Sequence, residues 1–207
     1  KIKNQKIIEQ ARFLSQKYHI VVTNPPYLPV KNTGKKLQTY VKQNYPDSKT
    51  DLFAVFIERG TEFLIQGGLQ AMLTMHSWMF LSSYKTLRKK ILEKNTILNM
   101  IHLGKKAFEG IGGEVVQTTA FVLTNHMISN YRSSFQRLVD FNSQNAKEQA
   151  YLNHKNLYQL KVKQFFKIPG YPMIYWANEM ILKIFENAVC LKKIAAPKQG
   201  IATSNNP

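Results

Sequence analysis

The segment Ile20-Val21-Val22-Thr23-Asn24-Pro25-Pro26-Tyr27 carries the sharpest local signal in the sequence. Its β-branched start predicts a short buried strand, and the two prolines end that strand because proline cannot continue a central strand. Apolar residues at helical spacing within residues 4–17 predict a helix before it. Residues 28–50 are polar and rich in Lys, Gln, Asn and Gly, which predicts a long loop after it, of the functional or mobile kind.

Helix and strand patterns alternate along the rest of the chain. A helix over 51–65 has Asp51 or Thr50 as its N-cap and ends at Gly67-Gly68. Three further strands are expected, over residues 69–75, 97–103 and 115–124. Further helices are expected over 78–93, 144–156 and 177–187, with one more strand near 134–141. This alternation predicts an α/β fold with a parallel, doubly wound sheet, helices on both faces and an antiparallel strand at 115–124.

The Asn24–Tyr27 corner offers hydrogen-bond acceptors where a doubly wound sheet binds ligands, outside the C-terminal ends of its strands. Prolines supply no backbone donor, so the acceptors are the Asn24 side-chain oxygen and the Pro25 carbonyl. These would hold both N–H groups of an exocyclic amine and free its lone pair to attack a methyl sulfonium, with no carboxylate base. Tyr27 would stack on the base, which must first leave the duplex. The plainer alternative is a proline-rich turn with an aromatic lid.

The same segment resembles motif IV of the amino-group DNA methyltransferases. Three later segments resemble motif V, motifs VI and VII, and motif VIII of these enzymes, namely Asp51 to Glu58, Gly67 to Trp78 and Gly104 to Val122. Their order over residues 1–125 is similar to the γ-type adenine-N6 enzymes. Within that group the chain resembles the large enzymes of type IIG restriction–modification and of BREX phage-defence systems.

The resemblance implies a role for each matching residue. Asn24 and Pro25 accept from the adenine N6 amino group, Pro26 completes the catalytic motif, and Tyr27 stacks on the flipped base. Phe108 matches the motif VIII aromatic that packs the flipped base. The alternative for Phe108 is a loop aromatic that caps the sheet edge.

The implied cofactor is S-adenosylmethionine. Phe56 matches a motif V aromatic that lies against the cofactor adenine, although an aromatic on the apolar face of a helix is more often part of the core. The Gly-rich motif I loop precedes motif IV in this family, and nothing in residues 1–18 resembles it. Gly110-Ile111-Gly112-Gly113 does not follow the G-x-G-x-x-G pattern. We therefore expect a fragment that lacks the main cofactor loop and binds S-adenosylmethionine poorly.

The resemblance also divides the chain. Residues 1–125 correspond to the C-terminal half of a Rossmann-like methyltransferase domain. Residues 126–207, a less regular α+β segment, hold the end of that domain and the start of a target-recognition region. The absent N-terminal strands would leave a sheet edge open, which predicts a homodimer or strand swapping.

A net charge of +17 predicts a polyanionic partner, with double-stranded DNA as the first candidate. Four lysines follow the corner where a DNA strand would pass, namely Lys31, Lys35, Lys36 and Lys42. Ribosome contact, an acidic partner or charge balance in a longer protein remain alternatives. Restriction or defence-system subunits are further implied partners. A non-catalytic DNA-binding scaffold, or a methyltransferase acting on RNA or on protein glutamine, are the competing functions.

Composition bears on membrane contact, cellular location and metal binding. No stretch reaches the roughly 18 uncharged apolar residues of a membrane span, so we expect no membrane partner. Cys190 is the single cysteine, which excludes an internal disulfide and fits a reducing cytosol, so a cytoplasmic location is expected. The five histidines lack metal-ligand spacing, which predicts structural or solvent-facing roles and no metal.

Overall fold

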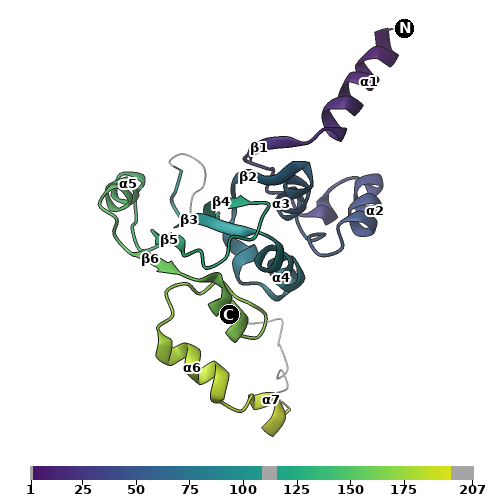
Figure 1. Ribbon diagram of the computed structural model, residues 1–207. Helices are drawn as coiled ribbons and strands as arrows, with labels where there is room; N and C mark the ends of the chain where they lie inside the picture. The colour runs from purple at the N-terminus through teal and green to yellow at the C-terminus, as the bar shows by residue number, and fades with distance from the viewer. Residues whose placement is uncertain (1, 109–115, 197–207) are drawn as a thin grey trace, which may run out of the picture.

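The computed structural model describes residues 2–108 and 116–196, folded around one six-stranded sheet in the order β1-β2-β4-β3-β5-β6 (Figure 1). The Gly110–Gly113 segment lies outside the described residues. The strands are β1 (Tyr18–Thr23), β2 (Leu64–Met75), β3 (Thr96–Gly104), β4 (Thr118–Thr124), β5 (Ser133–Arg137) and β6 (Leu157–Leu160). The predicted strands are therefore present, with boundaries shifted by a few residues.

The strand directions confirm the predicted α/β class. β1 runs parallel to β2, and β3 runs parallel to β5. β4 lies between β2 and β3 and is antiparallel to both, as predicted for the second of the two successive strands. The carboxyl ends of β1, β2, β3 and β5 consequently share one edge of the sheet, which is where such sheets bind ligands.

Helices cover the two faces unequally. On one face, α3 (Leu52–Phe63) and α4 (Lys85–Lys94) pack over a core that includes the fully buried Trp78, Phe121 and Phe135. On the other face, α5 (Gln144–Leu152) covers β5, where Gln136 Nε2 donates to the carbonyls of Ala150 and Tyr151 at 3.1 and 3.2 Å. The rest of this second face stays open near β1, β2 and β4.

Two expected elements differ from the structure. The polar stretch 28–50 is not a long loop, because it contains η1 (Val30–Asn32) and α2 (Lys35–Asn44). Val41 of α2 is buried with Tyr45 in a small second hydrophobic cluster. The lysines and glutamines around Val41 in the sequence leave no clear apolar pattern, so the helix was not predicted.

The predicted helix over 78–93 begins later, at Lys85, after η2 (His76–Met79) and η3 (Ser82–Tyr84). Arg88 accounts for the break. Its Nη1 donates to the Trp78 and Leu81 carbonyls at 2.8 and 2.6 Å, so the guanidinium holds carbonyls that a continuous helix would use.

β1 is an exposed edge strand rather than a buried one. Ile20 is 60% exposed and Val22 is 72% exposed, because β2 pairs with only one side of β1 and no helix of residues 2–108 or 116–196 covers their face. The β-branched run indicated a strand correctly, but it could not report what lies beside that strand.

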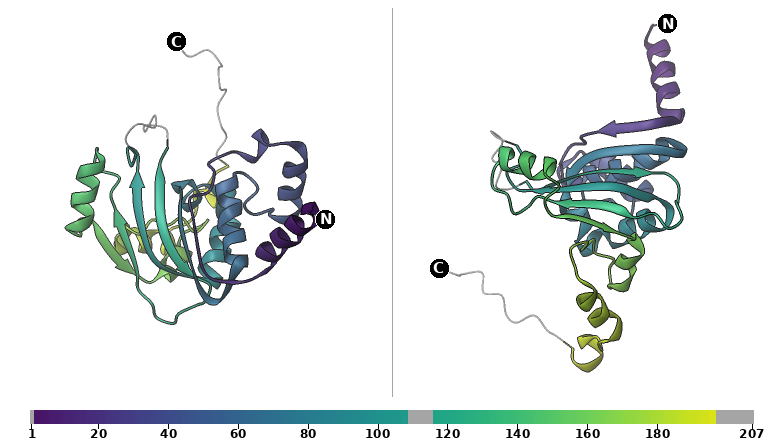
Figure 2. Two further views of the ribbon diagram at one scale, coloured as in Figure 1. Left: turned by 90° about the horizontal axis from the view of Figure 1, so that it is seen from above. Right: turned by 60° about the vertical axis from the view of Figure 1, so that its left-hand side comes forward.

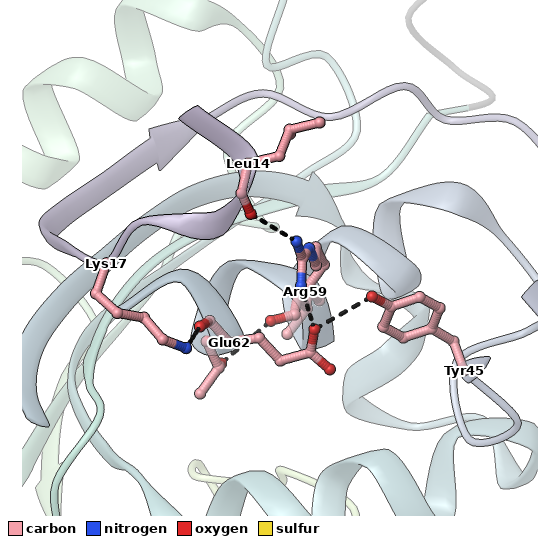
Figure 3. Close-up of polar contacts among 7 residues, drawn as sticks. Leu14, Lys17, Tyr45, Arg59 and Glu62 are labelled. Atoms are coloured by element: carbon pink, nitrogen blue, oxygen red, sulfur yellow. Dashed lines mark hydrogen bonds and ion pairs between the residues drawn. The ribbon is translucent and has the colours of Figure 1, made fainter. Parts of the chain in front are cut away.

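The N-terminal helix α1 (Ile2–Ser15) stands away from the sheet (Figure 2). Arg59 of α3 fixes its end, since Arg59 Nη2 donates to the Leu14 carbonyl at 3.2 Å (Figure 3). Glu62 accepts from Arg59 at 2.8 Å and from the Tyr45 hydroxyl at 3.2 Å, and Lys17 donates to the Glu62 carbonyl. α1 is thus tethered through polar contacts rather than through a packed apolar face.

The C-terminal part continues the same core before it extends away. Phe165 of η4 (Val162–Lys167) and Tyr175 are buried against Phe135 of β5. Beyond them, α6 (Glu179–Asn187) and α7 (Leu191–Ile194) lie apart from the sheet (Figure 1). The predicted division between residues 125 and 126 stays a prediction. No helix within the described residues is long and apolar enough to cross a membrane.

Candidate active site

The Asn24–Tyr27 corner leaves the sheet at the carboxyl end of β1. Asn24 is exposed, and Pro25 is buried behind it. Within residues 2–108 and 116–196, no hydrogen bond engages the Asn24 side chain or the Pro25 carbonyl. The corner therefore presents two acceptors that the fold itself does not use.

Tyr27 is held at the corner by its hydroxyl. The hydroxyl donates to the Leu73 carbonyl of β2 at 3.2 Å, and the ring meets Phe53 edge-on with centroids 6.3 Å apart. Burial raises the pKa of Tyr27 to about 12, so the hydroxyl remains a donor at neutral pH. With its hydroxyl fixed and its ring half-buried, the Tyr27 ring has a set position beside the acceptors.

Asp51 joins the corner to α3. It is the N-cap of that helix, the first of the two residues expected there, because its Oδ1 accepts from the Phe53 N–H at 3.2 Å. The same oxygen accepts from the Leu28 N–H at 3.1 Å, one residue beyond the corner. The Leu52 N–H donates to the Leu28 carbonyl at 3.0 Å in return. Burial raises the pKa of the Asp51 carboxyl, although the backbone donors oppose that shift.

An apolar groove of about 390 Å³ lies on the open face of the sheet beside the corner. Its lining includes Asn24, Leu73 of β2, and Ala120 and Val122 of β4. Asn24 is therefore accessible from the uncovered side of the sheet.

The two predicted aromatic partners are both exposed. Phe108 follows β3 at the same sheet edge as Asn24 and is 39% exposed, and no aromatic pair within the described residues joins it to Tyr27. Phe56 is 40% exposed on α3, so the alternative that it belongs to the core is wrong. An exposed ring fits a stacking partner for a cofactor adenine, and that role of Phe56 stays a prediction.

The predicted basic residues lie on the segment after the corner. Lys31 belongs to η1, Lys35 begins α2, and both side chains are exposed. Gln38 ties the segment together, since its Nε2 donates to the Lys31 carbonyl at 3.1 Å and to the Thr33 carbonyl at 2.7 Å. A structured segment, rather than a loose loop, thus presents these charges.

A comparison with known protein families gives the family of this chain. The Eco57I restriction-modification methylase model matches residues 1–108. The chain belongs to this family. The resemblance predicted from the four motif segments is thereby confirmed.

Two curated relatives of this Eco57I-family chain are long proteins. The adenine-specific methyltransferase PglX of Lacticaseibacillus casei (strain Zhang) is 44% identical over 207 residues, which cover 97% of this chain and 17% of that protein. The adenine-specific methyltransferase BrxX of Escherichia coli O9:H4 (strain HS) is 44% identical over 179 residues, covering 86% of this chain and 15% of that protein. The chain thus spans less than a fifth of the length of either relative.

A solved structure shares the fold. The nuclease-deletion mutant of the Type ISP restriction-modification enzyme LlaGI, in complex with a DNA substrate mimic, matches with a TM-score of 0.58 and 16% identity. The match covers 84% of this chain and 19% of that chain. The fold shared with that structure therefore covers a larger share of this chain than the family model does.

Sequence reasoning missed one polar cluster in this Eco57I-family chain. His76 follows β2 and His102 lies on β3, and the fold brings their rings to 2.7 Å between Nδ1 and Nε2. Only the pairing of distant strands creates this contact, so no local spacing could have indicated it. No group of three or more His, Cys, Asp or Glu side chains arranged for a metal occurs in the part of the chain that the structure describes.

Proposed function

We propose that this chain carries the target-base site of an S-adenosylmethionine-dependent DNA adenine-N6 methyltransferase. The observation that carries the proposal is the pair of unengaged acceptors on Asn24 and Pro25 beside the fixed ring of Tyr27. The names of PglX and BrxX, both adenine-specific methyltransferases, support the choice of base.

The corner acts by positioning. The Asn24 Oδ1 and the Pro25 carbonyl accept the two N–H groups of the adenine amine and pull its nitrogen toward tetrahedral geometry, which exposes the lone pair. Tyr27 stacks on the flipped base. The amine attacks while neutral and loses its proton late, so the corner needs no carboxylate. The bound cofactor supplies the electrophilic methyl group.

This chain alone is expected to bind S-adenosylmethionine poorly. Phe56 offers an exposed ring for the cofactor adenine, and nothing in residues 1–18 resembles the Gly-rich cofactor loop. We therefore expect calorimetric titration of the chain with S-adenosylmethionine to give no measurable heat of binding. Tight binding would show that the cofactor site lies within these residues and would refute the predicted absence of the loop.

DNA is the partner that the charge favours. A net charge of +17 and the exposed Lys31 and Lys35 beside the corner supply phosphate contacts. Replacing both lysines by glutamine lowers the slope of log affinity against log salt by about 0.9 for each duplex phosphate that the two side chains neutralise. Salt-dependent DNA binding without methylation in any context favours the non-catalytic scaffold instead.

A chimera tests the catalytic proposal. In the chimera, this chain takes the place of the matched segment of PglX from Lacticaseibacillus casei. The remainder of the chimera is PglX. We expect the chimera to transfer methyl groups to duplex DNA and digestion of the product to yield N6-methyladenine. Methylation of RNA or of a glutamine peptide in preference to DNA would support the competing substrates, and a folded chimera that binds cofactor but methylates nothing would overturn the proposal.

The exposed edge of β1 is a site for self-association. Its backbone groups on the outer side have no partner strand among the described residues, and Ile20 and Val22 are exposed beside them. We expect sedimentation velocity to show a dimer that forms with rising concentration and that Val22→Lys weakens. A strictly monomeric species at high concentration would contradict this.

A further inference from the structure

Three buried or half-buried side chains form a hydrogen-bonded chain at the edge of the sheet. Tyr175 and His102 are 3% and 4% exposed. The Tyr175 hydroxyl lies 3.0 Å from His102 Nδ1, and His102 Nε2 lies 2.7 Å from His76 Nδ1. The three residues come from the C-terminal segment, from β3 and from η2, so tertiary folding alone assembles them.

The direction of the hydrogen bonds follows from Tyr175. Its buried hydroxyl has no other partner among the described residues, so donation to His102 Nδ1 is the direction that leaves no buried hydroxyl proton unpaired. His102 then carries its proton on Nε2 and donates to His76 Nδ1. His76 in turn carries its proton on Nε2. That N–H has no acceptor within residues 2–108 and 116–196.

His76 and His102 both stay neutral at physiological pH. Burial lowers the pKa of His102 to about 3, with further lowering by His76, Arg137 and Lys147. Burial also lowers the pKa of His76. The tautomers are therefore set by hydrogen bonding rather than by pH, and the Nε2–H of the half-buried His76 is a neutral donor at physiological pH.

The Phe80 ring contacts both His76 and Trp176. Phe80 meets His76 edge-on at 5.6 Å and Trp176 at 5.8 Å between centroids. Trp176 packs against Tyr175 at 4.9 Å and is 38% exposed, so part of its ring faces outward. The Arg137 guanidinium lies 5.4 Å from the Trp176 centroid, and its Nε is buried without a partner among the described residues.

The cluster stands at the same sheet edge as the corner. His76 begins η2 directly after β2, three residues beyond Leu73, whose carbonyl holds the Tyr27 hydroxyl. β1 and β2 are parallel neighbours, so Asn24 and His76 both follow the carboxyl ends of adjacent strands.

We propose that the His76 Nε2–H and the exposed ring of Trp176 bind a nucleobase of a DNA strand near the Asn24–Tyr27 corner. A neutral donor beside an aromatic ring matches a base, whose ring stacks while a ring nitrogen or carbonyl accepts. A phosphate fits less well, because both histidines are neutral and Arg137 already pairs with Asp140. The inference rests on the proposed function for the identity of the strand.

Short single-stranded oligodeoxyadenylate and an abasic strand of the same length test the site with this chain. Trp78 is 0% exposed and Trp176 is 38% exposed, so quenching by the adenylate reports on Trp176. We expect quenching by the adenylate, its loss in Trp176→Phe, and little quenching by the abasic strand. The anisotropy of labelled strands gives the affinities.

His76→Phe keeps a ring but removes the donor. It should weaken binding of the adenylate by about three- to tenfold and leave binding of the abasic strand unchanged. His126→Phe is the matched control, because His126 is exposed beyond the opposite end of β4 and should change neither affinity. Equal losses for both strands would indicate a phosphate contact and overturn the proposal, as would an unchanged adenylate affinity.

Long-range nitrogen–proton NMR gives a second readout that does not depend on a variant. We expect the free chain to show His76 protonated on Nε2, and this signal to shift when adenylate is added. A Nδ1 tautomer or an unmoved signal would refute the site. Failure of the PglX chimera to methylate, with base-dependent binding intact, would refute the proposed function and leave the base site standing.

Discussion

Replacing Asp51 tests how the corner is held. Its Oδ1 accepts from the Phe53 N–H at 3.2 Å and from the Leu28 N–H at 3.1 Å, and the residue is 7% exposed. Asp51→Ala loses the helix cap, at about 1 kcal/mol. It also leaves the Leu28 N–H unpaired, at about 1 kcal/mol more. The free energy of unfolding should therefore fall by about 2 kcal/mol.

Asp51→Asn separates geometry from charge. Asparagine keeps the acceptor oxygen and removes a carboxylate whose pKa burial raises, so we expect stability within about 0.5 kcal/mol of the wild type. A raised pKa means that the wild type loses stability as pH rises through it, and the Asn variant should lack this change. Urea denaturation at several pH values measures both effects. Equal destabilisation by Ala and Asn would contradict a role for the acceptor oxygen, and so would an Ala variant as stable as the wild type.

Three further changes test the scaffold. Arg88→Met should lower the free energy of unfolding by about 3 kcal/mol in urea denaturation, because the carbonyls of Trp78, Leu81 and Gly170 lose their donor. Arg88→Lys should not restore the lost stability. Gly60→Ala should cost about 1–3 kcal/mol by thermal unfolding, since a Cβ would lie 2.7 Å from Gln70 Nε2, and an unchanged melting temperature would contradict this. The lowered pKa of His102 means that its contribution to stability is present above pH 6.5 and is lost toward pH 3, at up to about 1.4 kcal/mol for each pH unit. A His102→Phe variant that keeps the same pH slope would count against that assignment.

The sequence predicted the features that depend on neighbouring residues. The β-branched run and its prolines placed β1 and the corner, and Asp51 marked the start of α3, since both depend on neighbouring residues. The second hydrogen bond of Asp51, to Leu28, was not predicted because it joins segments 23 residues apart. The exposure of Val22 likewise depends on which element lies beside β1, and the strand pattern carries no such information.

Missed features share a non-local origin. α2 was predicted as a loop because its buried residue, Val41, packs on Val30 and Tyr45 outside the helix. The contact between His76 and His102 arises from sheet order, with β4 inserted between β2 and β3. The roles of Phe56 and Phe108 remain predictions, and their exposure is consistent with ligand contact.

Methylation by the PglX chimera with and without Asn24→Ala tests whether the Asn24–Tyr27 corner holds the adenine amine. We expect the variant to bind S-adenosylmethionine like the unaltered chimera but to methylate adenine about 100- to 1,000-fold more slowly, because one of the two acceptors is gone. His126→Phe in the same chimera should keep full activity. An Asn24→Ala chimera that methylates within about tenfold of the unaltered one would show that the corner does not hold the adenine amine.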